Sequence, residues 1–295
     1  MAQAHVTDAN KYYIPHDSHW PIVGSVALFT LMIGLVCLLN HYTGAWSLIP
    51  GFALVFFMFF GWFKTVIDEN QHGIYNLQVD KSFRMGMMWF IFSEVMFFAA
   101  FFGALFYARV LSVPWLAGEG VKIFNNILLW PQYESAWPTN GPAAVGGHEG
   151  GTFDVIPAFG LPAINTLILL SSGVTITIAH HALRESKRGI LTVFLAATFL
   201  LGFLFVFLQA HEYGEAYKEL GLRLDTGIYG STFFMLTGFH GFHVTIGAIM
   251  LLVIWLRVVR GHFSPERHFA FEAVAWYWHF VDVVWLGLFV FVYWI

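Results

Sequence analysis

The sequence predicts an all-α integral membrane protein that crosses the bilayer seven times. Of its 295 residues, 58% are hydrophobic and only 11% are charged, and its mean hydropathy is +0.67. Soluble domains carry about 25% charged residues, so this chain could not cover its own surface with polar groups. The second observation is a series of seven apolar stretches, each long enough to cross a bilayer core. We therefore expect lipid to surround most of the chain.

The length of each apolar stretch sets the predicted helices. A hydrocarbon core about 30 Å thick needs roughly 20 helical residues at about 1.5 Å rise per residue. The predicted helices occupy residues 21–40, 46–66, 84–112, 159–184, 188–212, 226–257 and 268–294. Barrel strands would instead alternate in polarity over about ten residues. The longest predicted loop, 112–158, is rich in glycine and proline.

Ionisable residues are almost absent from the apolar cores of these helices. The exceptions are Glu94 in the third helix, His240 and His243 in the sixth, and His279 and Asp282 in the seventh. An ionisable side chain at mid-bilayer costs at least about 2.5–3.5 kcal/mol on insertion scales, so each exception requires an explanation. Counting from the helix ends places these five residues in overlapping depth bands near the membrane centre.

The distribution of basic residues predicts the orientation. Short loops that are rich in lysine and arginine stay on the cytoplasmic side. One side of the predicted topology receives ten of the 14 basic residues, and the other side receives Arg109, Lys122, Lys218 and Arg223. We therefore expect the N-terminus in the cytoplasm or matrix and the C-terminus on the opposite side. Eight of the 14 histidines then fall on the inner side: His5, His16, His19, His72, His180, His181, His262 and His268.

Composition excludes several classes of protein. A formal net charge of −4 offers no case for nucleic-acid binding. The single cysteine, Cys37, can form neither a disulfide framework nor a cysteine metal cage. No internal repeat of the kind found in inverted-repeat transporters stands out.

Three interpretations of the intramembrane residues remain open. Glu94 and a histidine can form a buried polar cluster that locks the third helix against the sixth, because His240 and His243 share one helical face. The same residues can form a proton or ion pathway. A metal or haem site is less favoured, since His180 and His181 point to different faces and no cysteine or carboxylate box is evident beside them.

Several motifs resemble a known family. The third helix contains Phe92-Ser93-Glu94-Val95-Met96-Phe97-Phe98, which is similar to the signature ISEVLFF. The sixth contains Tyr229-Gly230-Ser231-Thr232-Phe233-Phe234 and Thr237-Gly238-Phe239-His240-Gly241-Phe242-His243-Val244. The last contains Phe271-Glu272-Ala273 and Ala275-Trp276-Tyr277-Trp278-His279-Phe280-Val281-Asp282-Val283-Val284-Trp285. Together with Ala179-His180-His181 and Gln209-Ala210, these motifs closely resemble subunit III of haem–copper cytochrome c oxidases, over nearly the whole chain.

The resemblance implies a single subunit III domain over residues 1–295 without redox centres. Helices 1–2 and 3–7 would form two bundles with a lipid-filled cleft between them. The partners would be subunits I and II, with haems and copper held in partner subunits, and cytochrome c would act on this chain only indirectly. The implied function is to support O₂ reduction coupled to proton translocation, by sustaining proton uptake and stabilising subunit I through helix and lipid contacts. No catalytic residue and no metal ligand is expected on this chain.

The resemblance also implies roles for single residues. Glu94 matches the intramembrane carboxylate that carbodiimides modify in this family, and His240 and His243 would accompany it. Arg257 and Trp62 match residues that hold phospholipid headgroups, with Asp68 on an acidic position nearby. The physical setting suits these roles, because a guanidinium at a helix end can bind a lipid phosphate and tryptophan favours the interface.

Two departures from the mitochondrial pattern affect these expectations. The 112–158 loop is much longer, which favours a bacterial enzyme in the inner (plasma) membrane, with a periplasmic C-terminus. The 68–81 loop differs in detail from the mitochondrial pattern. The resemblance therefore gives less support to lipid contacts from this loop. The alternatives are subunit III of a quinol oxidase, whose relatives usually lack the first two helices, a free-standing proton or ion transporter, and a di-iron oxygenase. The last would need many more histidines on the inner face.

Overall fold

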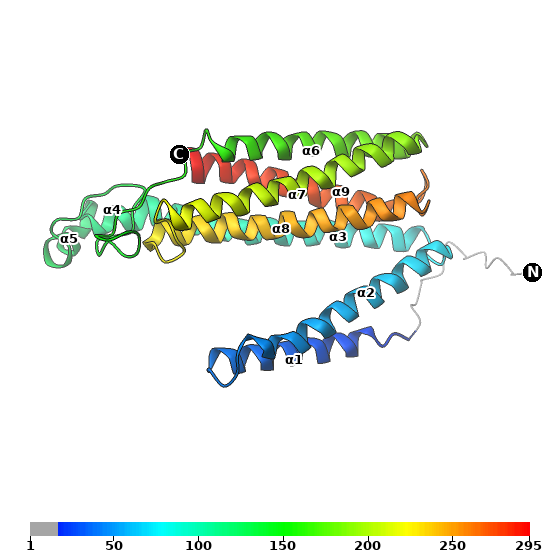
Figure 1. Cartoon of the computed structure of the whole chain (residues 1–295), viewed down its shortest axis with the longest axis horizontal. Coiled ribbons are helices and arrows are strands. Elements are labelled where there is room, and N and C mark those ends of the chain that lie inside the picture. Colours follow the sequence, from blue (N-terminus) through cyan, green and yellow to red (C-terminus); the bar gives the residue numbers. More distant parts are fainter. Residues whose placement is uncertain (1–16) are drawn as a thin grey trace, which may run out of the picture. The chain divides into compact units, whose positions relative to one another are not determined.

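The computed structural model describes residues 17–295, and every regular element in that range is a helix (Figure 1). Seven helical stretches in these residues are long and apolar enough to cross a membrane. The predicted fold class, an all-α protein with seven transmembrane helices, is therefore confirmed. His5 and His16, which the sequence analysis places on the inner side, and Lys11, one of the ten basic residues counted there, lie outside the described residues.

The membrane-crossing elements have the following bounds. They are α1 (Trp20–Leu39), α2 (Ile49–Gln71), α3 (Leu77–Phe106), α6 (Leu161–Arg184), α7 (Arg188–Lys218), α8 (Gly227–Val259) and α9 (Phe269–Leu288). A 3₁₀ turn at Ala45–Leu48 precedes α2, and π-helical turns at Tyr107–Ser112 and Phe289–Trp294 continue α3 and α9. The short elements α4 (Val113–Leu116), a 3₁₀ turn at Gly120–Lys122 and α5 (Ile123–Leu129) follow α3.

Three predicted helices were too short, because hydropathy marks the apolar stretch whereas backbone hydrogen bonding continues into polar sequence. The helix predicted at 84–112 begins at Leu77, where the Asn76 side chain accepts a hydrogen bond from the Val79 amide (3.0 Å). The helices predicted at 46–66 and 188–212 end at Gln71 and Lys218. The other predicted bounds lie within two residues of the observed ones once the adjoining 3₁₀ and π-helical turns are counted, which is the usual spread at helix ends.

The long segment 112–158 is more ordered than a loop rich in glycine and proline predicts. Besides α4 and α5, it makes backbone and side-chain hydrogen bonds to the α7–α8 connection. The Asp154 amide donates to the Leu220 carbonyl (2.9 Å), and His148 contacts the carbonyl of Glu219 (3.1 Å). These contacts give the segment a defined path at one end of α7 and α8.

The chain folds as two compact units, Met1–Met85 and Gly86–Ile295. In the first unit, α1 and α2 form a hairpin whose close approach depends on glycine. A Cβ atom on Gly61 would overlap the Trp20 ring, and one on Gly51 would lie 2.5 Å from the Leu31 backbone. The Trp20 indole N–H donates to Thr65 Oγ1 (3.1 Å). Small residues thus let the two helices approach, as is common in membranes.

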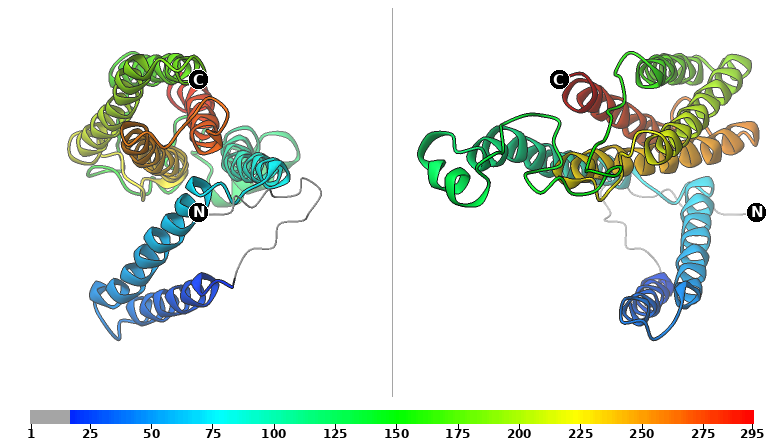
Figure 2. Two further views of the ribbon diagram at one scale, coloured as in Figure 1. Left: turned by 90° about the vertical axis from the view of Figure 1, so that its right-hand side faces the viewer. Right: turned by 60° about the vertical axis from the view of Figure 1, so that its left-hand side comes forward.

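The second unit contains a four-helix arrangement in which α6 contacts α7 and α9, and α8 contacts α7 and α9 (Figure 2). Large side chains fill its centre, including Trp278, Trp285 and Phe205, none more than 1% exposed. Two indole N–H groups of α9 donate to hydroxyls of α6, Trp278 to Ser172 (2.8 Å) and Trp285 to Thr166 (2.9 Å). The core is therefore aromatic, and two of its indole N–H groups are hydrogen-bonded across helices.

Within this unit, α3 packs through large side chains. Phe97 lies edge-on to Phe239 of α8 (5.1 Å between centroids), and Phe98 is 6.0 Å from Phe280 of α9. These ring contacts set the position from which Glu94 reaches α8. The prediction that residues 1–295 form a single domain stays a prediction.

Candidate functional site: a carboxylate–histidine pair between two helices

Glu94 of α3 and His243 of α8 meet directly. His243 Nε2 lies 2.8 Å from Glu94 Oε2. The other ring nitrogen, Nδ1, donates to the Phe239 carbonyl one turn earlier in α8 (2.6 Å). The predicted pairing of Glu94 with His240 or His243 is confirmed for His243. A histidine whose second nitrogen is held in this way has a fixed ring orientation.

These two hydrogen bonds determine how many protons the pair holds. A carbonyl oxygen cannot donate, so Nδ1 must carry one proton. The Nε2···Oε2 contact requires a second proton between the histidine and the carboxylate. The pair is then either imidazolium with carboxylate or neutral imidazole with carboxylic acid, and both forms have zero net charge. Glu94 can therefore be buried among apolar helices without an isolated charge, at far lower cost than an unpaired carboxylate.

Aromatic rings surround the pair. Phe98 lies 5.0 Å, Phe97 5.8 Å and Tyr277 6.4 Å from the His243 ring, between centroids. The side chains of His243 and Glu94 keep 11% and 21% exposure in this chain alone. The carboxylate is thus the more exposed member of the pair in this chain.

His240 has a different environment, although it lies only three residues before His243. It is fully buried, its Nε2 donates to the Val281 carbonyl of α9 (3.0 Å), and its Nδ1 has no hydrogen-bond partner. Its ring lies 5.1 Å from that of Trp285. His240 thus joins α8 to α9, whereas His243 joins α8 to α3, and only His243 contacts Glu94.

His279 and Asp282, predicted at similar depth, form a second polar group on α9 rather than joining Glu94. His279 Nδ1 lies 3.7 Å from Asp282 Oδ2. Asp282 is 7% exposed and approaches α6 at Gly173, where a Cβ atom would lie 2.6 Å from its Oδ2. The intramembrane ionisable residues are therefore divided between separate helix interfaces.

Two further groups were not singled out as sites from the sequence. Tyr293 donates to Glu212 Oε1 (2.7 Å) in the interior of the second unit. His180 of α6 and His268 lie beside Glu272 of α9, with nitrogen–oxygen distances of 3.7 and 3.1 Å. Sequence reasoning found no carboxylate near His180, because Glu272 is 92 residues away along the chain. The motif Phe271-Glu272-Ala273 indicated the family resemblance, but it did not predict that Glu272 lies beside His180 and His268.

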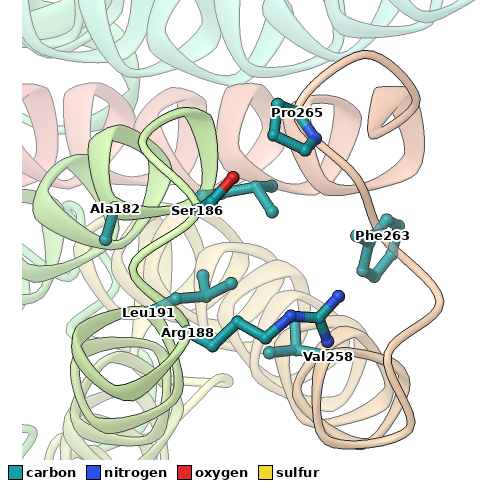
Figure 3. Close-up of a pocket in the computed structure, with 8 residues that line it drawn as sticks. Ala182, Ser186, Arg188, Leu191, Val258, Phe263 and Pro265 are labelled. Atoms are coloured by element: carbon teal, nitrogen blue, oxygen red, sulfur yellow. The ribbon is translucent and has the colours of Figure 1, made fainter.

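The three residues expected to bind lipid lie in different settings, each described within its own unit. Trp62 and Asp68 are exposed on α2. Arg257, near the end of α8, is 7% exposed, and its guanidinium carbon lies 4.5 Å from the Phe263 ring centroid. No carboxylate pairs with Arg257 in residues 17–295. A nearby cavity is bounded by Val258 and Phe263 and by residues from the ends of α6 and α7 (Figure 3).

The fold and the pair define a class: a polytopic helical membrane protein with an intramembrane carboxylate neutralised by a histidine. Comparison with known proteins identifies the family. The sequence model of the family "Cytochrome c oxidase subunit III" matches residues 10–121 and 118–295. The chain is 39% identical to cytochrome c oxidase subunit 3 of Gadus morhua and 40% identical to that of Oncorhynchus masou, in each case over 97% of both chains. It is 38% identical to that of Marchantia polymorpha over 98% of both chains.

The chain belongs to the cytochrome c oxidase subunit III family. It is therefore a subunit of an oxidoreductase complex, as its motifs indicated, and an integral membrane protein. The family is non-catalytic, and aerobic respiration and proton translocation are the processes of the complex to which such a subunit belongs. The relatives do not favour the quinol oxidase alternative.

Proposed function

We propose that this chain supports the catalytic subunit of its oxidase by holding a protonatable, net-neutral pair, Glu94–His243, at the junction of α3 and α8. The observation that carries the proposal is the 2.8 Å contact whose geometry requires a shared proton. The pair braces the two helices, and its partly exposed carboxylate can exchange protons with a neighbouring subunit. Sustained proton uptake into subunit I and resistance to inactivation during turnover would follow, while electrons pass only through haems and copper in partner subunits.

The test is Glu94→Gln in the intact oxidase. We expect the haem spectrum to stay unchanged, because no redox centre depends on Glu94. O₂ consumption should change modestly, while proton uptake and the number of turnovers before inactivation should fall. Glu149→Gln, which neutralises an exposed carboxylate in the 112–158 segment, is the matched control. Loss of haem from the Glu94 variant alone, or turnover lifetime equal to that of the control, would contradict the proposal.

We also propose that Arg257 binds a phospholipid phosphate, with Trp62 and Asp68 near headgroups on α2. Support comes from the guanidinium, which stacks on Phe263 and has no carboxylate partner among the described residues. An unpaired, largely buried cation is costly unless an anion neutralises it. Arg257→Ala should reduce the phospholipid retained by the purified complex and shorten its functional lifetime, as lipid mass spectrometry and activity decay can measure. Arg260→Ala, on a neighbouring exposed arginine, is the control. Equal lipid content in the two variants would refute this role.

We propose subunits I and II as the partners, a bacterial plasma membrane as the location, and a cytoplasmic N-terminus. Support comes from the length of the 112–158 segment and from the excess of basic residues on one side. Affinity purification in mild detergent should recover haem-bearing partners, and cysteine labelling at each terminus should show opposite sides. A free-standing transporter would instead purify alone and carry ion flux in vesicles. The lipid-filled cleft stays a prediction.

A further inference from the structure

His180, His268 and Glu272 form a cluster whose geometry the proposed function does not use. The three residues come from the last two turns of α6, the residue before α9 and the first turn of α9. Glu272 Oε1 lies 3.1 Å from His268 Nε2 and 3.7 Å from His180 Nε2, and all three atoms lie within 4.8 Å of one another. All belong to the second compact unit.

Two histidine nitrogens of this cluster lack a hydrogen-bond partner. His268 Nδ1 faces the Ser264 carbonyl at 3.1 Å and must donate to it, so Nε2 of the neutral ring carries only a lone pair. Nε2 of His268 and Nε2 of His180 are both buried and have no hydrogen-bond partner. Two imidazole nitrogens therefore converge on one carboxylate oxygen, and neither is aligned for a hydrogen bond to it. A single proton could join the carboxylate to only one of them.

We propose that these three residues form a binding site for a divalent transition-metal ion of the zinc type. Two imidazoles and one carboxylate are a known ligand set for Zn²⁺, with a water in the fourth position. Bonds of about 2.0–2.1 Å in a tetrahedron place ligand atoms about 3.3 Å apart, between the two separations found here. The bond from His268 Nδ1 to the Ser264 carbonyl is the outer-shell contact that orients a metal-binding histidine.

The metal ion would tie the end of α6 to the start of α9. His180 and Glu272 are 92 residues apart in sequence, and the described structure joins the two helix ends here through side chains alone. His180 and His268 already lie 5.5 Å apart between ring centroids, so little movement is needed. His181, the next residue, is exposed and outside the cluster. It provides a matched control on the same helical turn.

The test uses the intact oxidase complex, equilibrated with buffered Zn²⁺ alone and analysed for total zinc by mass spectrometry. We expect His180→Gln, His268→Gln and Glu272→Gln each to lose one Zn²⁺ per chain, or to bind it at least about tenfold more weakly. His181→Gln should match the unsubstituted complex. Equal zinc content in all five proteins, or the same loss in His181→Gln, would overturn the proposal.

A second measurement needs no substituted protein, and it therefore tests the site even if the variants fail to assemble. In the unsubstituted complex, Zn²⁺ should protect His180 and His268, but not His181, from modification by diethyl pyrocarbonate, as peptide mass spectrometry can show. X-ray absorption at the zinc edge should report nitrogen and oxygen ligands with two imidazoles. Modification of His268 at the same rate with and without Zn²⁺ would refute the site. The proposal is independent of the role of Glu94, so either can fail alone.

Discussion

The α1–α2 hairpin and the four helices α6–α9 solve the problem of packing in a membrane differently. In the apolar windows of α1 and α2, 11% and 6% of residues are buried, whereas in α8 and α9 the shares are 44% and 50%. The hairpin relies on glycines that let backbones approach. The four-helix arrangement relies on buried aromatic rings and on hydrogen bonds between helices. Because lipid is as apolar as leucine, only close packing and polar contacts can favour one helix pairing over another.

This difference explains where ionisable residues can be placed. The hairpin has no interior in which a buried acid could find partners. The second unit has one, and there Glu94, Asp282 and Glu212 each meet a side chain of another residue. We therefore expect proton-exchanging side chains in the second unit.

The largest effect should come from removing a buried ring in the second unit. Trp278 is fully buried, so Trp278→Ala would leave a large cavity and remove the hydrogen bond to the Ser172 hydroxyl. We expect a loss of roughly 3–5 kcal/mol of folding free energy. Phe60→Ala, at a ring that is 77% exposed on α2, should have little effect. Thermal denaturation in detergent would measure both. Similar losses in the two variants would contradict the conclusion that buried rings stabilise the second unit more than exposed rings stabilise the hairpin.

An intermediate effect is expected from filling a glycine contact in the hairpin. A Cβ atom on Gly61 would overlap Trp20, so Gly61→Ala should destabilise the hairpin by about 1–3 kcal/mol. Gly103 of α3 has nothing within 4 Å of the added atom, and Gly103→Ala should be neutral or slightly stabilising. Protease accessibility of the α1–α2 connection would report the loss. If Gly61→Ala resisted cleavage as well as Gly103→Ala does, close glycine packing would not be what holds the hairpin.

The smallest effect should come from a single hydrogen bond between helices. Ser172→Ala removes the acceptor of the Trp278 N–H and should cost about 1–2 kcal/mol, because a buried donor is left unsatisfied. Ser171→Ala is the neighbouring control, since that hydroxyl is exposed and bonds only within α6. A lower melting temperature for Ser172→Ala than for Ser171→Ala would show that this bond between helices stabilises the second unit. Equal melting temperatures would mean that the Trp278–Ser172 bond does not contribute to holding α6 to α9.

The structure confirms the predicted contact between Glu94 and His243, whereas His240 bonds to a different helix. Helical periodicity placed His240 and His243 on one face, yet their rings turn to different neighbours, one to Val281 and one to Glu94. A separation of three residues leaves about 60° between side chains, which is enough to reach two different helices. Depth alone also grouped His279 and Asp282 with Glu94, because position along a helix carries no information about which helices are adjacent.

The sequence by itself determined the lipid environment of the helices, the number of membrane crossings and the family. Hydrophobic length and linear motifs are properties of contiguous residues. Only the tertiary structure decided which residues meet: Glu94 with His243, and Glu272 with His180 and His268. These pairs join helices far apart in the chain, and their formation depends on how each helix is rotated about its axis and which helix it packs against. That rotation follows from ring packing around residues such as Trp278 and Phe98, which no local pattern in the sequence specifies.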